Sequence, residues 1–103
     1  MKDMFSLEGK IALVTGGSKG IGAMIAEGFI NFGAKVYLVS RNKDVLKKKQ
    51  QELSEIGPCE YIVADVSSVA GIEALAEAYG EKEHSLDILV NNAGRSDGRK
   101  QIE

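Results

Sequence analysis

Four short apolar runs alternate along this chain with three segments of helical periodicity. The runs cover Ile11–Val14, Val36–Val39, Tyr61–Ala64 and Leu86–Val90, and only Asp87 interrupts them. Nearly continuous apolar runs, rather than alternating ones, are typical of parallel strands that are covered on both faces. The pattern therefore predicts an α/β protein in which helices lie on both sides of a sheet.

The segments between the runs are expected to form helices, each with one apolar stripe. The first runs from about Gly20 to Phe32, with Gly33 as its stop and a stripe of Ile21, Ile25, Phe29 and Phe32. The second is expected to start after the N-cap Asn42 and to end at Gly57-Pro58, with Leu46, Leu53 and Ile56 facing the core. The third is expected to start after Ser67 or Ser68. The residues expected to face the core are Val69, Ile72, Leu75, Ala76 and Tyr79.

This βαβαβαβ order restricts the topology of the sheet. Crossovers between parallel strands are right-handed in nearly all proteins, so the order predicts a doubly wound parallel sheet of the Rossmann type, with strand order 3-2-1-4. The first strand is central in that order. Its carboxyl end opens onto the crevice in which such sheets bind ligands.

A glycine-rich stretch follows the first strand and has the properties of a phosphate-binding turn. Residues Thr15 to Gly22 follow the pattern Thr-Gly-x-x-x-Gly-x-Gly. A turn of this kind directs backbone N–H groups and the positive end of a helix dipole at one spot. The three glycines would form a tight exit from the strand, a close approach to a pyrophosphate and a close helix–strand contact. A Walker A loop is excluded, because Gly20 follows Lys19; a tight turn without a ligand is the alternative.

The residues after the second strand discriminate between the two nicotinamide cofactors. NAD sites usually place an acid here, which accepts a hydrogen bond from the ribose 2′-hydroxyl. This chain instead has Ser40, Arg41 and Asn42. A guanidinium pairs with a 2′-phosphate that a carboxylate would repel, and Lys19 adds a second cation. NADP(H) is therefore predicted in preference to NAD(H), unless Arg41 and Lys19 are only solvated loop charges.

Composition mainly excludes classes of partner. The formal net charge of the 103 residues is −2, which argues against a nucleic-acid partner. No apolar run approaches about 18 residues, so no membrane partner and a cytoplasmic location are expected. The single cysteine, Cys59, is expected to be a small buried side chain, and no metal site is predicted. Lys47–Lys49 and His84 are expected on the surface.

Several segments resemble the short-chain dehydrogenase/reductase family, and together they span nearly the whole chain. They are Leu7–Lys10, Thr15–Gly22, Asp65-Val66 and Leu86–Gly94, the last of which is highly specific to the family. Within the family, the chain looks most like the NADPH-dependent 3-oxoacyl reductases, including the rhamnolipid-biosynthesis branch. The resemblance implies an oxidoreductase that passes hydride between NADPH and a carbonyl or alcohol substrate, for which a 3-oxoacyl thioester is a candidate.

The resemblance also implies roles for individual residues around the cofactor. The pyrophosphate loop would comprise Gly16, Gly17, Ser18, Lys19, Gly20, Ile21 and Gly22. The 2′-phosphate would be surrounded by Ser40, Arg41 and Asn42. Asp65 would accept a hydrogen bond from the adenine amino group and Val66 would pack on the ring, although Asp65 alone reads equally well as a helix N-cap. The ribose and nicotinamide would lie beside Asn92, Ala93 and Gly94, and Asn91 would tie the central strands together.

The catalytic residues of the family have no counterpart in this sequence. The family uses a serine, a Tyr-x-x-x-Lys pair and an upstream asparagine, whereas Tyr37, Tyr61 and Tyr79 are followed four residues later by Arg41, Asp65 and Glu83. We therefore predict no catalytic residue here, and no activity of these 103 residues alone. A non-catalytic, truncated dinucleotide-binding module is the second hypothesis for the function.

The domain organisation is expected to be one NADP(H)-binding unit over residues 1–94 and a polar tail over 95–103. The sequence of this tail differs from the sequence that family members have at this point. It would fit a disordered end, an artificial boundary of the chain or a change of reading frame. In an incomplete sheet, Leu86–Val90 would leave an apolar edge unpaired, so a homo-oligomer or pairing with another chain is expected.

Overall fold

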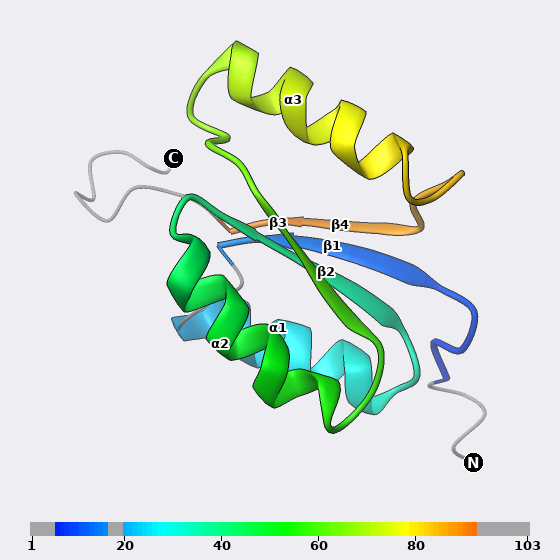
Figure 1. Cartoon of the computed structure of the whole chain (residues 1–103). Coiled ribbons are helices and arrows are strands. Elements are labelled where there is room, and N and C mark those ends of the chain that lie inside the picture. Colours follow the sequence, from blue (N-terminus) through cyan, green and yellow to red (C-terminus); the bar gives the residue numbers. More distant parts are fainter. Residues whose placement is uncertain (1–5, 17–19, 93–103) are drawn as a thin grey trace.

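The computed structural model describes residues 6–16 and 20–92, which form one sheet between two layers of helix. The elements are β1 (Ile11–Thr15), α1 (Gly20–Asn31), β2 (Lys35–Ser40), α2 (Lys43–Ser54), β3 (Cys59–Val63), α3 (Val69–Gly80) and β4 (Ile88–Asn91). All strand pairs are parallel and the strand order is β3-β2-β1-β4. Helices α1 and α2 cover one face of the sheet and α3 covers the other (Figure 1). The predicted fold class and strand order are confirmed.

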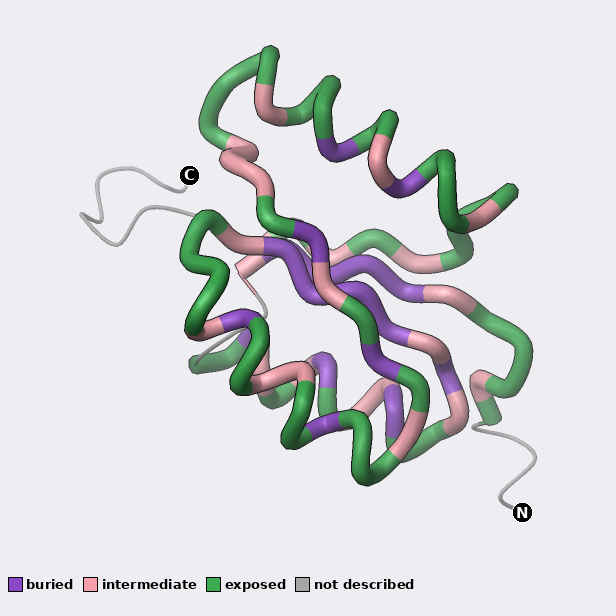
Figure 2. The backbone as a smooth tube through the Cα atoms, viewed as in Figure 1, coloured by how far each residue is buried: buried purple, intermediate pink, exposed green. Residues whose placement is uncertain are grey.

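The hydrophobic core lies on both faces of the two central strands. Figure 2 shows that these strands are mostly buried. On the face of α1 and α2, the buried residues include Val14, Leu38 and Leu46. On the face of α3, they include Leu13 and Tyr37. The expectation of strands covered on both faces holds for β1 and β2. It holds in part for β3, where Cys59 and Ile62 are buried in the clusters of opposite faces. It is wrong for β4, which has no buried residue: Ile88 and Val90 pack against the cluster on the side of α1 and α2, while Leu89 is exposed.

The predicted apolar stripe of α1 is only partly right, because Phe29 packs against the core whereas Ile21 and Phe32 are exposed. Ile21 is 66% exposed and Phe32, just after the helix, is also exposed. The residues that α1 buries are instead Gly22, Ala26 and Ile30. Two of these residues are small, and at Gly22 an added Cβ would overlap the Gly16 carbonyl, so α1 lies close to the end of β1 there.

The other two helices begin at the predicted caps but bury fewer residues than expected. The Asn42 side chain caps α2 by accepting from the Val45 N–H at 3.1 Å, and Ser68 caps α3 by accepting from the Gly71 N–H at 3.0 Å. Helix α2 ends before Ile56, which is exposed, and in α3 only Leu75 and Tyr79 are buried. The expected inward placement of Val69, Ile72 and Ala76 is therefore wrong. These residues lie on a side of α3 that no described element covers.

The residues that were expected to have no role in a site lie where predicted. Cys59 is buried, and burial raises the pKa of its thiol to about 12. His84, Lys47 and Lys48 are exposed, and Lys49 is partly exposed, with its Nζ paired to Glu52 at 2.9 Å. Every described helix has 12 residues, short of the roughly 20 that a helical membrane crossing requires. Association through β4, where Leu89 is exposed, and a cytoplasmic location stay predictions.

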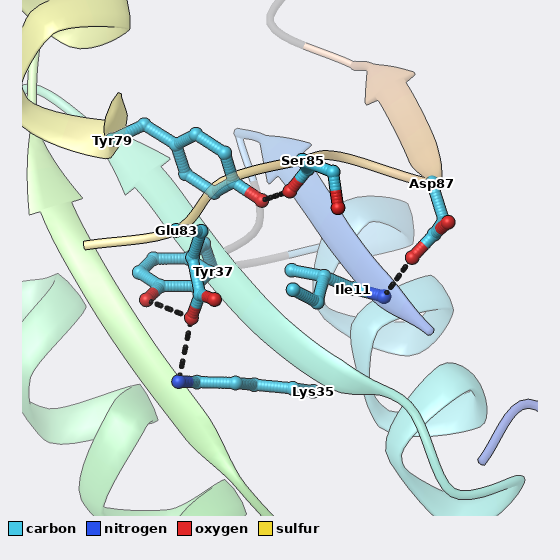
Figure 3. A network of polar contacts seen from close by, with 7 residues as sticks. All are labelled: Ile11, Lys35, Tyr37, Tyr79, Glu83, Ser85 and Asp87. Atoms are coloured by element: carbon cyan, nitrogen blue, oxygen red, sulfur yellow. Dashed lines mark hydrogen bonds and ion pairs between the residues drawn. The ribbon is translucent and has the colours of Figure 1, made fainter. Parts of the chain in front are cut away.

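A polar network fixes the connection between α3 and β4 against the amino ends of the central strands (Figure 3). The Glu83 carboxylate accepts hydrogen bonds from Lys35 Nζ and Tyr37 Oη, both at 2.7 Å. The Tyr37 ring meets the Tyr79 ring edge-on, with centroids 5.1 Å apart. Asp87 then accepts from the Ile11 N–H through Oδ2 at 2.9 Å, which sets β4 beside β1.

This network should make the fold less stable at alkaline pH. Burial, and then the hydrogen bond to Glu83, raise the pKa of Tyr37 from 10.0 to about 12. Because the folded protein holds this proton more tightly, its contribution is complete below about pH 10 and is lost as pH rises toward about 12. Urea unfolding at about pH 9 and about pH 11 measures the loss, which should be smaller in Tyr37→Phe. An equally steep loss in that variant would contradict the assignment.

Candidate functional site

The register of the sheet brings four chain segments to one edge. Thr15 at the end of β1 lies beside Val39 of β2 and Asn91 of β4. Ser40 at the end of β2 lies beside Val63 of β3. The carboxyl ends of all four strands therefore lie at one edge of the sheet, where open α/β sheets bind their ligands.

At Gly16 and Gly20, the two described ends of the glycine-rich segment between β1 and α1, the backbone fits the tight turn that the sequence predicts. Gly16 and Gly20 adopt φ values of 69° and 63°, in the left-handed region that glycine enters without steric cost. The Gly16 N–H donates to the Val39 carbonyl at 2.7 Å, so β2 anchors the start of the turn. Helix α1 begins at Gly20 and has no acid in its first turn. Its positive end is therefore not neutralised by a carboxylate of its own first turn and favours an anion.

Gly22 provides the close contact that the pattern required. A Cβ on this residue would overlap the carbonyl oxygen of Gly16 and lie 2.8 Å from Nδ2 of Asn92. The first turn of α1 therefore lies directly against both the glycine turn and the residue that follows β4. No side chain fits between these three segments in their present arrangement.

Thr15 connects the same segments through its hydroxyl, a role that the sequence analysis missed. Its Oγ1 accepts from the Asn92 N–H at 2.9 Å. The same hydroxyl lies 3.1 Å from Oδ1 of Asn91 and 3.3 Å from the Val90 carbonyl, to one of which it donates. The expected role of Asn91 in tying the central strands is confirmed. The sequence did contain a signal for this role: Thr15 is a polar residue at the end of a buried strand, and a buried hydroxyl needs a hydrogen-bond partner.

Arg41 and Asp65 occupy neighbouring positions where β2 and β3 end. The Ala64 N–H donates to the Ser40 carbonyl at 2.9 Å, which holds the two exits together. Hydrogen bonds from the Ser67 hydroxyl and N–H, and to a smaller extent the charge of Arg41, lower the pKa of Asp65. Asp65 therefore stays ionised, beside an exposed guanidinium.

The structure brings together most of the predicted site residues that it describes. Gly16, Gly22 and Asn92 form one cluster, next to which α1 begins at Gly20. Ser40, Arg41, Asp65 and Val66 follow β2 and β3 at the same edge of the sheet. The Asn42 side chain caps α2 and the Ser40 hydroxyl accepts from the Asn42 N–H at 3.2 Å, so both have local structural roles. Asp65 is not the cap of α3, because Ser68 is. Gly17, Ser18, Lys19, Ala93 and Gly94 lie outside the described residues.

Comparison with known proteins identifies the family. The family model of short-chain dehydrogenases matches residues 10–103. The chain belongs to this family. Over 98 residues it is 52% identical to the rhamnolipids biosynthesis 3-oxoacyl-[acyl-carrier-protein] reductase of Pseudomonas aeruginosa. The match covers 95% of this chain and 38% of that relative, so the chain spans well under half of the relative's length.

Two solved structures are similar to this chain over most of its length. The Pseudomonas aeruginosa RhlG/NADP active-site complex matches with a TM-score of 0.90 and 52% identity, over 94% of this chain and 39% of that one. L-sorbose reductase from Gluconobacter frateurii, complexed with NADPH and L-sorbose, matches with a TM-score of 0.83 and 39% identity. That match covers 88% of this chain and 35% of the reductase.

Proposed function

We propose that this chain forms the NADP(H)-binding unit of a short-chain dehydrogenase. The observation that carries the proposal is the close contact of Gly22 with the Gly16 carbonyl and Asn92, which packs the start of α1 directly against the glycine-rich turn and the residue after β4. A pyrophosphate needs such a turn, because the backbone N–H groups must approach its oxygens closely. A Cβ on Gly20 would meet nothing within 4 Å, so the described surface there is open to a ligand.

The preference for NADP(H) rests on the charges at the ends of β2 and β3. Arg41 is exposed at the position where an NAD site usually has a carboxylate. The guanidinium would pair with the 2′-phosphate, while the ionised Asp65 would accept a hydrogen bond from the adenine amino group. The relatives named above as NADP and NADPH complexes support this choice.

The bound cofactor would supply the hydride, and the residues of this chain would position it. The N–H groups at the start of α1 would hold the pyrophosphate, and Asn92 would lie beside the ribose of the nicotinamide half. Because Thr15 bonds to the Asn92 N–H at 2.9 Å, β1 would fix the nicotinamide side relative to the phosphate turn. We propose that this NADP(H)-binding unit spans residues 1–94.

The substrate class follows from the family rather than from this edge of the sheet. We propose a carbonyl or alcohol substrate, and among these a 3-oxoacyl thioester, because the similar Pseudomonas protein is a 3-oxoacyl reductase. Oxidation of NADPH with a panel of ketones and 3-oxoacyl thioesters, using the protein that carries this chain, identifies the substrate. Cofactor binding without turnover on any of them would favour the non-catalytic module.

Calorimetric titration with NADPH and NADH tests the proposed cofactor. We expect saturable binding of both, with NADPH bound at least about tenfold more tightly, since a hydrogen bond to a charged group contributes about 1.5–3 kcal/mol. Equal affinities would contradict the preference for NADP(H). The absence of saturable binding of either would contradict the proposed function itself.

A further inference from the structure

The first turn of α3 lies unusually close to the strand exit that carries Asp65. A Cβ built on Gly71 would overlap the carbonyl oxygen of Asp65 and lie 2.7 Å from its carbonyl carbon. Atoms cannot approach so closely, so any side chain at position 71 must displace either α3 or the Asp65 backbone. The absence of a side chain at Gly71 therefore sets where the Asp65 backbone lies.

Two serines hold the same segment in a tight turn. The Ser67 N–H and hydroxyl donate to Oδ1 of Asp65 at 3.0 and 2.6 Å. The Ser68 hydroxyl accepts from the Gly71 N–H at 3.0 Å and so closes the other end of the turn. Both contacts to the carboxylate fall on Oδ1, which leaves the lone pairs of Oδ2 to accept from a ligand.

We propose that Gly71 is a positioning residue for recognition of the adenine base. Without a side chain, it lets α3 close against the Asp65 carbonyl, while Ser67 fixes the rotation of the carboxylate. Together they aim Asp65 at the 6-amino group of adenine and present Val66 to the ring. This inference rests on the proposed function, because it assumes that the base binds at this edge.

A purely structural role of Gly71 predicts a different result. If the glycine only allowed α3 to form, a substitution would weaken binding of every cofactor equally, in proportion to the loss of folded protein. A positioning role instead changes the selectivity for the base. The hypoxanthine analogue of NADPH measures this, because its 6-oxo group is an acceptor where adenine has a donor.

The experiment compares Gly71→Ala with Gly80→Ala in the same helix, where an added Cβ would meet nothing within 4 Å. The wild type should bind NADPH at least about tenfold more tightly than the hypoxanthine analogue. Gly71→Ala should lose about tenfold in affinity for NADPH and little for the analogue, so that the ratio approaches one. Gly80→Ala should keep the wild-type ratio.

Ser67→Ala provides a second test that does not depend on whether Gly71→Ala folds. It removes the 2.6 Å hydrogen bond to Oδ1 and should reduce the adenine preference several-fold, with the thermal midpoint nearly unchanged. An unchanged base ratio in Ser67→Ala, or in folded Gly71→Ala, would overturn the positioning role. A wild type that does not bind NADPH would overturn the proposed function instead.

Discussion

Replacing Gly22 with alanine is expected to lower the affinity for NADPH by about tenfold to a hundredfold. The added methyl group would overlap the Gly16 carbonyl and crowd the Asn92 amide, 2.8 Å away. Overpacking a close contact costs about 1–3 kcal/mol, and each 1.4 kcal/mol corresponds to about tenfold in affinity. Because the displaced atoms belong to the phosphate turn and to the segment after β4, both halves of the cofactor should be affected. Calorimetric titration of the variant measures the loss.

Gly28→Ala is the matched control, because Gly28 lies in the same helix with nothing within 4 Å of the added Cβ. Alanine is favoured over glycine inside a helix by up to about 1 kcal/mol, so this variant should be slightly more stable than the wild type. Its affinity for NADPH should not change. Equal affinities of Gly22→Ala and Gly28→Ala for NADPH would contradict the assignment of the phosphate turn.

Replacing Arg41 with alanine should weaken NADPH binding by about tenfold or more and leave NADH binding nearly unchanged. The two cofactors differ only in the 2′-phosphate, and Arg41 is the exposed cation that follows β2. Hydrogen bonds to charged groups contribute about 1.5–3 kcal/mol, which corresponds to about ten- to more than a hundredfold in affinity. Parallel titrations with both cofactors measure the change in their ratio.

Lys47→Ala is the control that distinguishes a specific contact of Arg41 with the 2′-phosphate from the general effect of removing one positive charge. Lys47 is exposed on α2, away from the strand ends, and its removal changes the net charge by the same amount. This variant should keep the NADPH to NADH ratio of the wild type. If Arg41→Ala lowered the affinity for both cofactors by the same factor, or kept the wild-type ratio as Lys47→Ala should, the guanidinium would not bind the 2′-phosphate.

The order of strands and helices could be predicted because each element has a clear periodicity and a clear stop. The N-cap Asn42 and the stop at Gly33, where φ is 105°, are local signals that need no tertiary contact. The inner face of α1 could not be predicted in the same way. Of the large apolar residues in the predicted stripe, Phe29 packs against the core, but the residues that α1 buries fully include the small Gly22 and Ala26. At Gly22 the close contact is with Gly16 and Asn92, which only the folded chain brings there.

In the candidate site, too, the features set by local sequence could be predicted and those set by tertiary contacts could not. The glycine turn and the Arg41 position are local patterns, and the sequence predicted both. Thr15 and Gly71 were missed because their partners, Asn92 and the Asp65 carbonyl, meet them only in the folded chain. A glycine inside a helical pattern was the available signal for Gly71, since it is unfavourable there without a packing reason.

A chemical-shift titration of the labelled protein is the most direct test of whether NADP(H) binds where the four strands end. With NADPH, we expect saturable shifts at Gly16, Gly20–Gly22, Arg41, Asp65-Val66 and Asn92. The amides of Lys35 and Glu83, at the opposite end of the sheet, should not move. Saturable shifts centred on Lys35 and Glu83, or no saturable shifts at the strand ends, would contradict the claim.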